Sequence, residues 1–157
     1  MKRDPVFHVV LIEPEIPQNT GTIGRMCLAV GAKLHLIKPL AFDIDEKAVR
    51  RAGLDYWKFI DLEVHESADA FFKVLPPTAQ KVLVETRRDR TIYDVKFQPG
   101  AYLFFGKETT GIPKQILEAH SADIASIPMY DDRVRSLNLS NCASIVVYEA
   151  IRQIRAL

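Results

Sequence analysis

Short apolar runs alternate along this chain with segments of helical period, and this alternation most limits the folds open to it. The runs are rich in β-branched and aromatic residues and are nearly uninterrupted, as strands buried on both faces of a sheet are. We predict strands at Val6–Ile12, Lys33–Ile37, Lys81–Glu85, Ala101–Phe105 and Ile124–Ile127. The alternation predicts an α/β fold in which a mostly parallel sheet is flanked by helices.

The segments between the strands predict helices. The last helix is the clearest, because apolar residues recur at spacings of three and four from Ala143 to Ile154, and Ser140 or Asn138 can cap it. The first helix carries a similar stripe, and Gly31 can end it in the left-handed conformation. We predict the first helix at Thr20–Val30 and three further helices at Glu46–Ala52, Ser67–Val74 and Lys114–His120. The polar stretch Arg87–Pro99 is expected to be a loop.

Length and residue usage narrow the class of protein. A chain of 157 residues suits one hydrophobic core, so we predict a single domain over residues 1–157. No stretch approaches the ~20 apolar residues that span a bilayer, and no small-residue cleavage site follows the first apolar run. Cys27 and Cys142 lack a C-x-x-C partner and the four histidines are scattered, which indicates neither a disulfide framework nor a zinc site. We therefore expect a protein of the cytoplasm that is not bound to a membrane.

The net charge gives little indication of a polyanionic partner, because the chain has 21 Lys and Arg residues and 20 Asp and Glu residues. Any nucleic-acid contact must then come from local patches. The candidates are Arg50–Arg51, Arg87–Arg90 and Arg133 with Arg135. Each of these patches, taken alone, is more typical of a solvated surface.

Three segments that follow predicted strands are unusual, and ligands of open α/β sheets bind beyond the carboxyl ends of the strands. In Glu13–Arg25 two prolines stiffen the chain and two glycines permit close approach, yet the segment matches neither the dinucleotide nor the Walker fingerprint. Phe104–Pro113 is a glycine-rich turn from a strand into a helix. Ile127–Asn141 ends in a cluster of polar residues around two leucines, more than helix capping explains.

The residues of these segments resemble the three motifs of the SPOUT ribose 2′-O-methyltransferases. The matching positions are Asn19-x-Gly21 with Arg25, Phe105-Gly106-x-Glu108-x-x-Gly111, and Ile127-Pro128-Met129 followed by Ser136-Leu137-Asn138-x-Ser140-Asn141. The likeness extends through residues 13–17, 50–56 and 147–153. Over essentially the whole chain it is closest to the small enzymes that methylate the wobble nucleotide of tRNA, a cytidine or a modified uridine.

The resemblance implies features that residue patterns alone would not predict. One is a C-terminal trefoil knot whose loops hold S-adenosylmethionine, although knots are essentially absent from proteins in general. Another is a homodimer with the first and last helices at its interface, in which each copy completes the other's site. The implied substrate is the anticodon region of tRNA, with leucine tRNAs foremost, the implied product is S-adenosylhomocysteine, and no metal is required.

The resemblance also assigns roles to single residues. Arg25 occupies the position of the family's catalytic arginine; because guanidinium is effectively never deprotonated, we expect it to orient the ribose hydroxyl and stabilise the developing oxyanion. Asn19, Glu108 and Asn138 match active-site positions that would orient Arg25 and the ribose. The donor contacts fall at Val84, Gly106, Ile127, Ser136 and Leu137.

Two departures from the family pattern and two alternatives stand beside this interpretation. Thr22 replaces a usual Asn, and Tyr130–Val134 is one residue longer than usual. One alternative is a 2′-O-methyltransferase for another tRNA or rRNA position; many such relatives carry an extra N-terminal RNA-binding domain for which this chain has no room. The other is a noncatalytic nucleotide- or RNA-binding module, which would not require Arg25 together with the three polar residues of the site.

Overall fold

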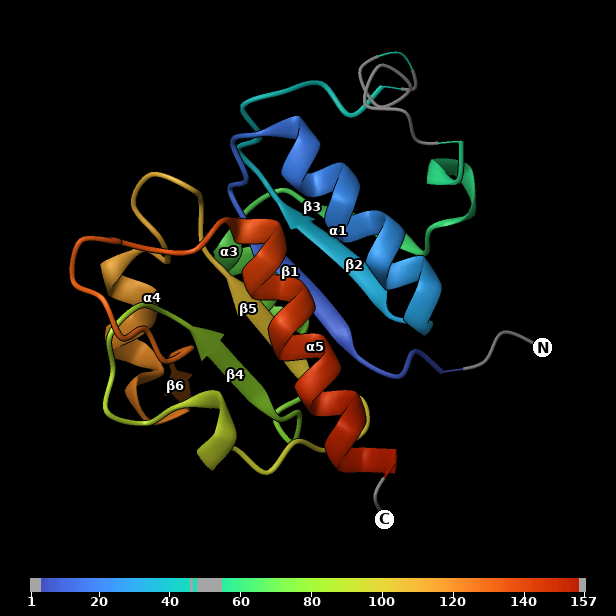
Figure 1. Cartoon of the computed structure of the whole chain (residues 1–157). Coiled ribbons are helices and arrows are strands. Elements are labelled where there is room, and N and C mark those ends of the chain that lie inside the picture. The colour runs from blue at the N-terminus through green and yellow to red at the C-terminus, as the bar shows by residue number, and fades with distance from the viewer. Residues whose placement is uncertain (1–3, 46, 48–54, 156–157) are drawn as a thin grey trace.

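Figure 1 shows the computed structural model of the chain, which describes residues 4–45, 47 and 55–155. Its strands are β1 (His8–Ile12), β2 (Lys33–Ile37), β3 (Leu62–His65), β4 (Lys81–Val84), β5 (Tyr102–Phe105) and β6 (Ile124–Ala125). They form one six-stranded sheet in the order β3-β2-β1-β5-β4-β6, and every pair of neighbours is parallel. The predicted α/β fold with a mostly parallel sheet is confirmed.

β1, β4 and β5 are one or two residues shorter than predicted, and two other strands differ more from the sequence prediction. β3 was not predicted, because it is a four-residue strand in which Glu63 and His65 interrupt the apolar pattern, and it pairs with β2 alone. β6 is shorter than predicted and ends at Ala125. Ser126 turns instead to the polar stretch after β4, where its N–H donates to the carbonyl of Arg90 and its own carbonyl accepts from Ile92.

The helices are α1 (Pro17–Val30), α3 (Ala68–Val74), α4 (Lys114–Ala119) and α5 (Leu139–Arg155). α1 begins three residues before the predicted start, with Pro17 in its first turn, and it ends at Gly31 with φ 77°, as predicted. Ser67, predicted inside α3, is its N-cap. The helix predicted at Glu46–Ala52 lies outside the described residues apart from Lys47, and so does the Arg50–Arg51 pair.

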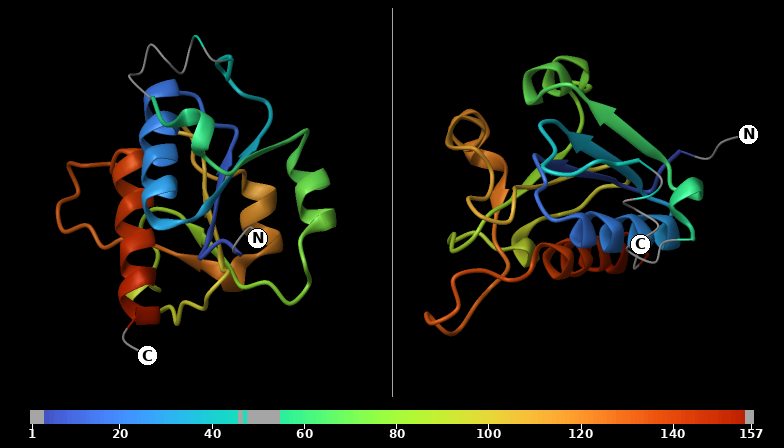
Figure 2. Two further views of the ribbon diagram at one scale, coloured as in Figure 1. Left: turned by 90° about the vertical axis from the view of Figure 1, so that its right-hand side faces the viewer. Right: turned by 90° about the horizontal axis from the view of Figure 1, so that it is seen from above.

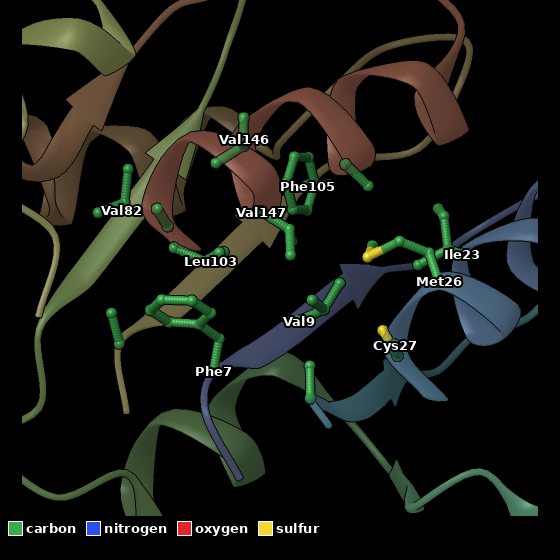
Figure 3. Close-up of a cluster of buried hydrophobic side chains, with 14 of the residues drawn as sticks. Phe7, Val9, Ile23, Met26, Cys27, Val82, Leu103, Phe105, Val146 and Val147 are labelled. Carbon is green, nitrogen blue, oxygen red and sulfur yellow. The ribbon is translucent and has the colours of Figure 1, made fainter. Parts of the chain in front are cut away.

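The sheet lies between two helical layers. Viewed from above in Figure 2, α1 and α5 cover one face of the sheet, while α3 and α4 lie on the other. On the α1 and α5 side, Val146 and Val147 meet Leu103 and Phe105 of β5 in the larger apolar cluster, which Figure 3 shows. The stripe on α5 is thus a core-packing face, and each buried valine or leucine contributes roughly 1.5–3 kcal/mol by leaving water.

The polar stretch Arg87–Pro99 contains one short 3₁₀ turn at Ile92–Asp94, which Thr91 caps, and otherwise connects β4 to β5 as a loop. No helix among the described residues is long and apolar enough to cross a membrane. The trefoil knot implied by the resemblance stays a prediction.

Candidate active site

A cavity of about 450 Å³ opens where β4 and β5 end. Each of the three unusual segments contributes to its wall. The lining residues are Ile16, Asn19, Val84, Glu85, Thr86, Phe105, Gly106, Lys107, Glu108, Thr109, Thr110, Gly111, Ile127, Met129, Arg135, Ser136, Leu137, Asn138, Leu139 and Cys142. Except for Arg25, every residue singled out for the site by sequence lines this one cavity.

Three polar side chains on the wall form a continuous chain of hydrogen bonds. Asn138 Nδ2 donates to Asn19 Oδ1 over 3.2 Å, and Asn19 Nδ2 donates to Glu108 Oε1 over 3.2 Å. Asn19 is 7% exposed, so its amide is fixed among its partners. These contacts join segments that are 119 and 89 residues apart in the sequence, and they make the three segments one site.

The carboxylate of Glu108 also holds the start of the first segment. It accepts from the backbone N–H of Glu15 at 2.8 Å and from that of Ile16 at 3.0 Å. Glu15 returns the contact, because its Oε1 accepts from both the N–H and the hydroxyl of Thr109. The hydrogen bond from the Thr109 hydroxyl is the main reason that the pKa of Glu15 is lowered. These reciprocal hydrogen bonds hold the turn after β5 against the chain before α1.

Asn138 also caps the N-terminus of α5. Its Oδ1 accepts from the N–H of Ser140 at 2.9 Å and from the Ser140 hydroxyl, so of the two predicted caps Asn138 is the one used. An N-cap of this kind satisfies backbone donors that the helix itself cannot. The side chain that reaches Asn19 is therefore anchored at the N-terminus of α5, the longest helix of the described residues.

Gly106 is required by the protein's own turn. A Cβ at this position would lie 2.0 Å from the carbonyl carbon of Gly111 and 2.1 Å from the nitrogen of Ile112. The turn is closed by a hydrogen bond from the N–H of Gly111 to the carbonyl of Lys107 and by Glu85, whose carboxylate accepts from the N–H of Ile112 at 3.1 Å. The resemblance places Gly106 in contact with the methyl donor, but the need for glycine at this position already follows from the backbone of Gly111 and Ile112.

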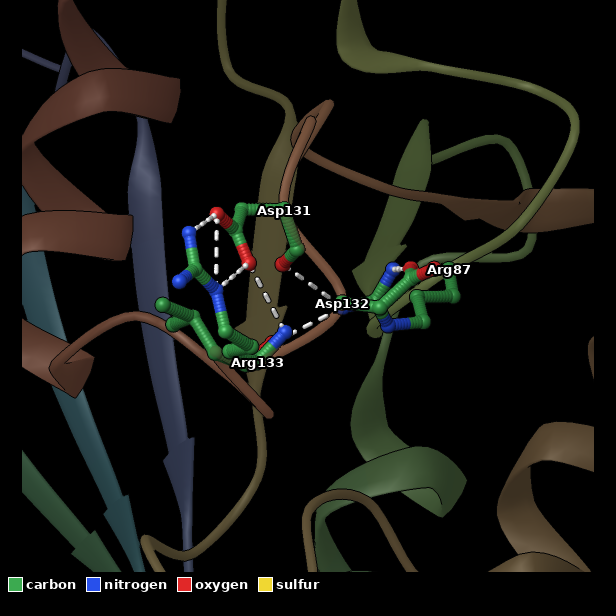
Figure 4. A network of polar contacts seen from close by, with 5 residues as sticks. Arg87, Asp131, Asp132 and Arg133 are labelled. Carbon is green, nitrogen blue, oxygen red and sulfur yellow. Dashed lines mark hydrogen bonds and ion pairs between the residues drawn. The ribbon is translucent and has the colours of Figure 1, made fainter.

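The long loop before Ser136 is held by an arginine from the stretch after β4 (Figure 4). The Arg87 guanidinium donates to the Asp132 carboxylate at 2.9 Å and to the carbonyl of Val134 at 2.8 Å. Asp131 pairs with Arg133. Arg135, from the same loop, donates to the carbonyl of Thr109 at 3.3 Å. Two of the arginines considered for RNA contact, Arg87 and Arg135, thus form hydrogen bonds that stabilise the loops around the cavity.

Arg25 is the predicted residue that the structure does not bring to the cavity. It is exposed on α1, and its guanidinium carbon lies 5.2 Å from the centroid of the Tyr56 ring. Residues six apart on an α-helix point about 120° away from one another, and accordingly Asn19 lines the cavity whereas Arg25 does not.

Sequence reasoning missed several residues that build the cavity. Glu85 ends the third predicted strand, so its place at a carboxyl end was a usable signal, whereas Glu15 and Thr109 carried none beyond their polarity. Cys142 also lines the cavity, and its burial raises the pKa of the thiol to about 11.

Replacing Glu108 by glutamine tests the hydrogen-bonded wall. Three N–H donors converge on this carboxylate, from Glu15, Ile16 and Asn19, so one oxygen and one NH₂ cannot serve them all. We expect Glu108→Gln to lower the free energy of unfolding by about 1–3 kcal/mol. Chemical denaturation measures this loss, and Glu118→Gln, an exposed change on α4, is the matched control. Equal stability of both variants with the parent would contradict the arrangement.

The chain belongs to the SpoU rRNA Methylase family, whose model matches residues 6–148 and so includes the sheet and all three segments of the cavity. Among individual proteins, it is similar to the tRNA (cytidine(34)-2'-O)-methyltransferase of Saccharophagus degradans, with 47% identity over 150 residues that cover 95% of this chain and 96% of the relative.

Two solved structures extend the comparison. One, described as "Structural insights into the 2-OH methylation of C/U34 on tRNA", superposes with a TM-score of 0.90 at 41% identity and covers 96% of this chain and 97% of its own. The other is the SpoU methyltransferase AviRb from Streptomyces viridochromogenes in complex with the cofactor AdoMet, with a TM-score of 0.82 at 27% identity, covering 98% of this chain and 60% of its own.

Proposed function

We propose that this protein transfers the methyl group of S-adenosylmethionine to the ribose 2′-hydroxyl of the tRNA wobble nucleotide, a cytidine or modified uridine, with leucine tRNAs as its substrates. The observation that carries the proposal is the Glu108–Asn19–Asn138 chain of hydrogen bonds on the wall of one cavity. The wobble position is favoured over other RNA sites because the 47%-identical relative named for cytidine 34 matches almost the whole chain.

The cavity suits the proposed methyl donor. Its volume of about 450 Å³ is that of an ordinary small-ligand site. Val84, Ile127 and Leu137 offer apolar surface for the faces of an adenine ring, while Gly106 and Ser136 leave main-chain groups accessible for its edge. The AdoMet complex of the related AviRb structure supports this choice of donor. Bound here, S-adenosylmethionine supplies an electrophilic methyl group and leaves as S-adenosylhomocysteine.

The residues around the cavity would align and polarise the ribose hydroxyl. A hydroxyl is a poor nucleophile, so the rate depends on its orientation and on stabilisation of the oxygen as charge develops. Asn19 and Asn138 present amide groups held in place by Glu108 and by the first turn of α5. In our proposal these groups position the ribose and Arg25 stabilises the oxygen; none of these steps requires a metal.

Because Arg25 faces away from the cavity of its own chain, we propose a homodimer in which Arg25 of a second copy completes each site. The outward sides of α1 and α5 support such an interface, since they expose Leu28, Ile145 and Tyr148. We further propose that residues 1–157 act as a single domain in the cytoplasm, where the free Cys27 and Cys142 would stay reduced.

The experiment that tests the function supplies the purified protein with isotopically labelled S-adenosylmethionine and a leucine tRNA lacking the wobble methyl group. Nuclease mapping should locate the label on the ribose of the wobble nucleotide. The matched control is the same tRNA with a 2′-deoxy wobble nucleotide, which should accept no label. Label at another tRNA position or only on rRNA would overturn the wobble assignment, and no incorporation into any RNA would favour a noncatalytic binding module.

A further inference from the structure

Three of the four histidines, scattered in the sequence, gather on one face of the sheet. His8 lies on β1, His35 on β2 and His65 on β3, and the parallel register places Val10 opposite His35 and Ile37 opposite His65. Because alternate residues of a strand share a face, the three imidazoles point to the same side. That side is covered by Phe71 of α3, whose ring centroid lies 5.4 Å from that of His35 and 4.8 Å from that of His65. No histidine lines the cavity of the candidate active site.

The imidazoles are in direct contact with one another. His8 Nδ1 and His35 Nε2 are 2.9 Å apart, and His35 Nδ1 and His65 Nε2 are 3.0 Å apart. His35 is 4% exposed, and burial lowers its pKa to about 3; burial also lowers the pKa of His8 and of His65. Imidazole binds metal ions in its neutral form, and burial favours that form at all three rings.

Glu63 adds a carboxylate to the group. It lies opposite His35 in the register of β2 and β3, and its Oε1 is 3.9 Å from His65 Nε2. Its other oxygen pairs with the ammonium of Lys33, and this contact is the main reason that the pKa of Glu63 is lowered. The side chain of Glu63 is 49% exposed and that of His65 is 10% exposed, so a solute can reach the group from the edge of the sheet.

We propose that His35 Nδ1, His65 Nε2 and Glu63 bind one divalent transition-metal ion, with Zn²⁺ as the best fit, and that this ion fastens the edge strand β3 to β2. Ligand atoms of the three residues all lie within 4.8 Å of one another. Tetrahedral zinc with bonds of about 2.0–2.1 Å needs ligand atoms roughly 3.3 Å apart, so side-chain shifts of up to about 1.5 Å would close the group around an ion whose fourth ligand is water.

His8 strengthens this assignment. A metal-binding histidine usually donates the hydrogen of its second ring nitrogen to a nearby acceptor, which fixes the tautomer. His8 Nδ1 can accept from His35 Nε2, and this leaves the lone pair of His35 Nδ1 directed toward His65. An imidazole set with one carboxylate suits Zn²⁺, Ni²⁺ or Cu²⁺ better than Mg²⁺ or Ca²⁺. The rival arrangement is a chain of imidazole hydrogen bonds that binds no metal.

The test titrates the metal-stripped full-length protein with Zn²⁺ by calorimetry and with Co²⁺ by visible absorption, whose bands report the ligand set. We expect one ion per chain, and at least a tenfold weaker affinity in His65→Gln and in Glu63→Gln. The control is His120→Gln, which removes the fourth histidine and should bind as the parent does. Circular dichroism checks that each variant is folded, and the exposed Glu63 gives a variant that leaves the core untouched.

A parent protein that binds no ion at this stoichiometry would leave the hydrogen-bonded chain as the correct description. So would affinities that are equal in the parent, His65→Gln and Glu63→Gln. Thermal unfolding gives an independent readout: Zn²⁺ should raise the melting temperature of the parent and of His120→Gln but not that of Glu63→Gln. None of these measurements depends on methyl transfer.

Discussion

Arg25→Ala is expected to lower the rate of methyl transfer by about 10²–10³-fold, the usual cost of removing one donor that stabilises a developing oxyanion. Affinity for S-adenosylmethionine should stay within a few-fold of the parent, because Arg25 is exposed on α1 and does not line the cavity. Single-turnover rates measure the first effect and calorimetry the second. Arg25→Lys, which keeps the charge but loses the planar fork of donors, should recover only part of the rate.

Complementation between two inactive variants shows which copy supplies the arginine. Leu137→Asp should prevent S-adenosylmethionine from binding in the cavity, and it leaves the residues of α1 unchanged. If Arg25 serves the neighbouring copy, equal mixing of Arg25→Ala with Leu137→Asp restores one intact site in each mixed dimer, about a quarter of the parental activity for random exchange. No recovery in dimers that have exchanged would contradict the shared site, and parental activity of Arg25→Ala alone would contradict the role of the residue.

Gly106→Ala is expected to abolish donor binding and to destabilise the protein by ~3 kcal/mol or more, because the added carbon would lie 2.0–2.1 Å from the backbone of Gly111 and Ile112. No rotamer relieves contact between a Cβ and backbone, so the turn that walls the cavity must open. Chemical denaturation measures the loss of stability, and calorimetry with S-adenosylmethionine below the melting temperature measures the loss of binding.

The control for this change is Gly100→Ala. Gly100 has φ 80° but nothing within 4 Å of an added Cβ, so the substitution adds backbone strain of about 1–2 kcal/mol without any clash. It also lies outside the cavity, and donor affinity should be that of the parent. If Gly106→Ala bound the donor as tightly as Gly100→Ala does, the close packing of the turn could not be what the site requires.

The fold could be predicted wherever local pattern and burial agree. β2 was predicted to the residue because Leu34, Leu36 and Ile37 mark a short strand after Gly31, and all four residues from Leu34 to Ile37 are buried in the sheet. β3 was missed because an edge strand needs only one partner and tolerates polar residues such as Glu63. The three unusual segments could be brought together from sequence because strand ends in a parallel sheet meet at one edge.

Properties that depend on register and helical phase could not be predicted from the sequence. The predicted first helix began at Thr20 and left Asn19 outside it, whereas α1 contains both Asn19 and Arg25, and their spacing of six then turns them about 120° apart. The contacts among His8, His35 and His65 depend on how three strands pair, and no spacing along the chain encodes that pairing. The clash that excludes a side chain at Gly106 involves residues five and six positions away, and it depends on how the turn folds back, which the sequence alone does not show.

The thiol of Cys142 has a consequence for a protein that would hold a reactive sulfonium beside it. Thiolates, rather than thiols, attack electrophilic carbon, and a thiolate in the cavity would itself be alkylated. With a pKa of about 11, only about one Cys142 side chain in ten thousand is ionised at neutral pH. If S-adenosylmethionine binds in the cavity as we propose, burial of the Cys142 thiol would limit its alkylation by the donor.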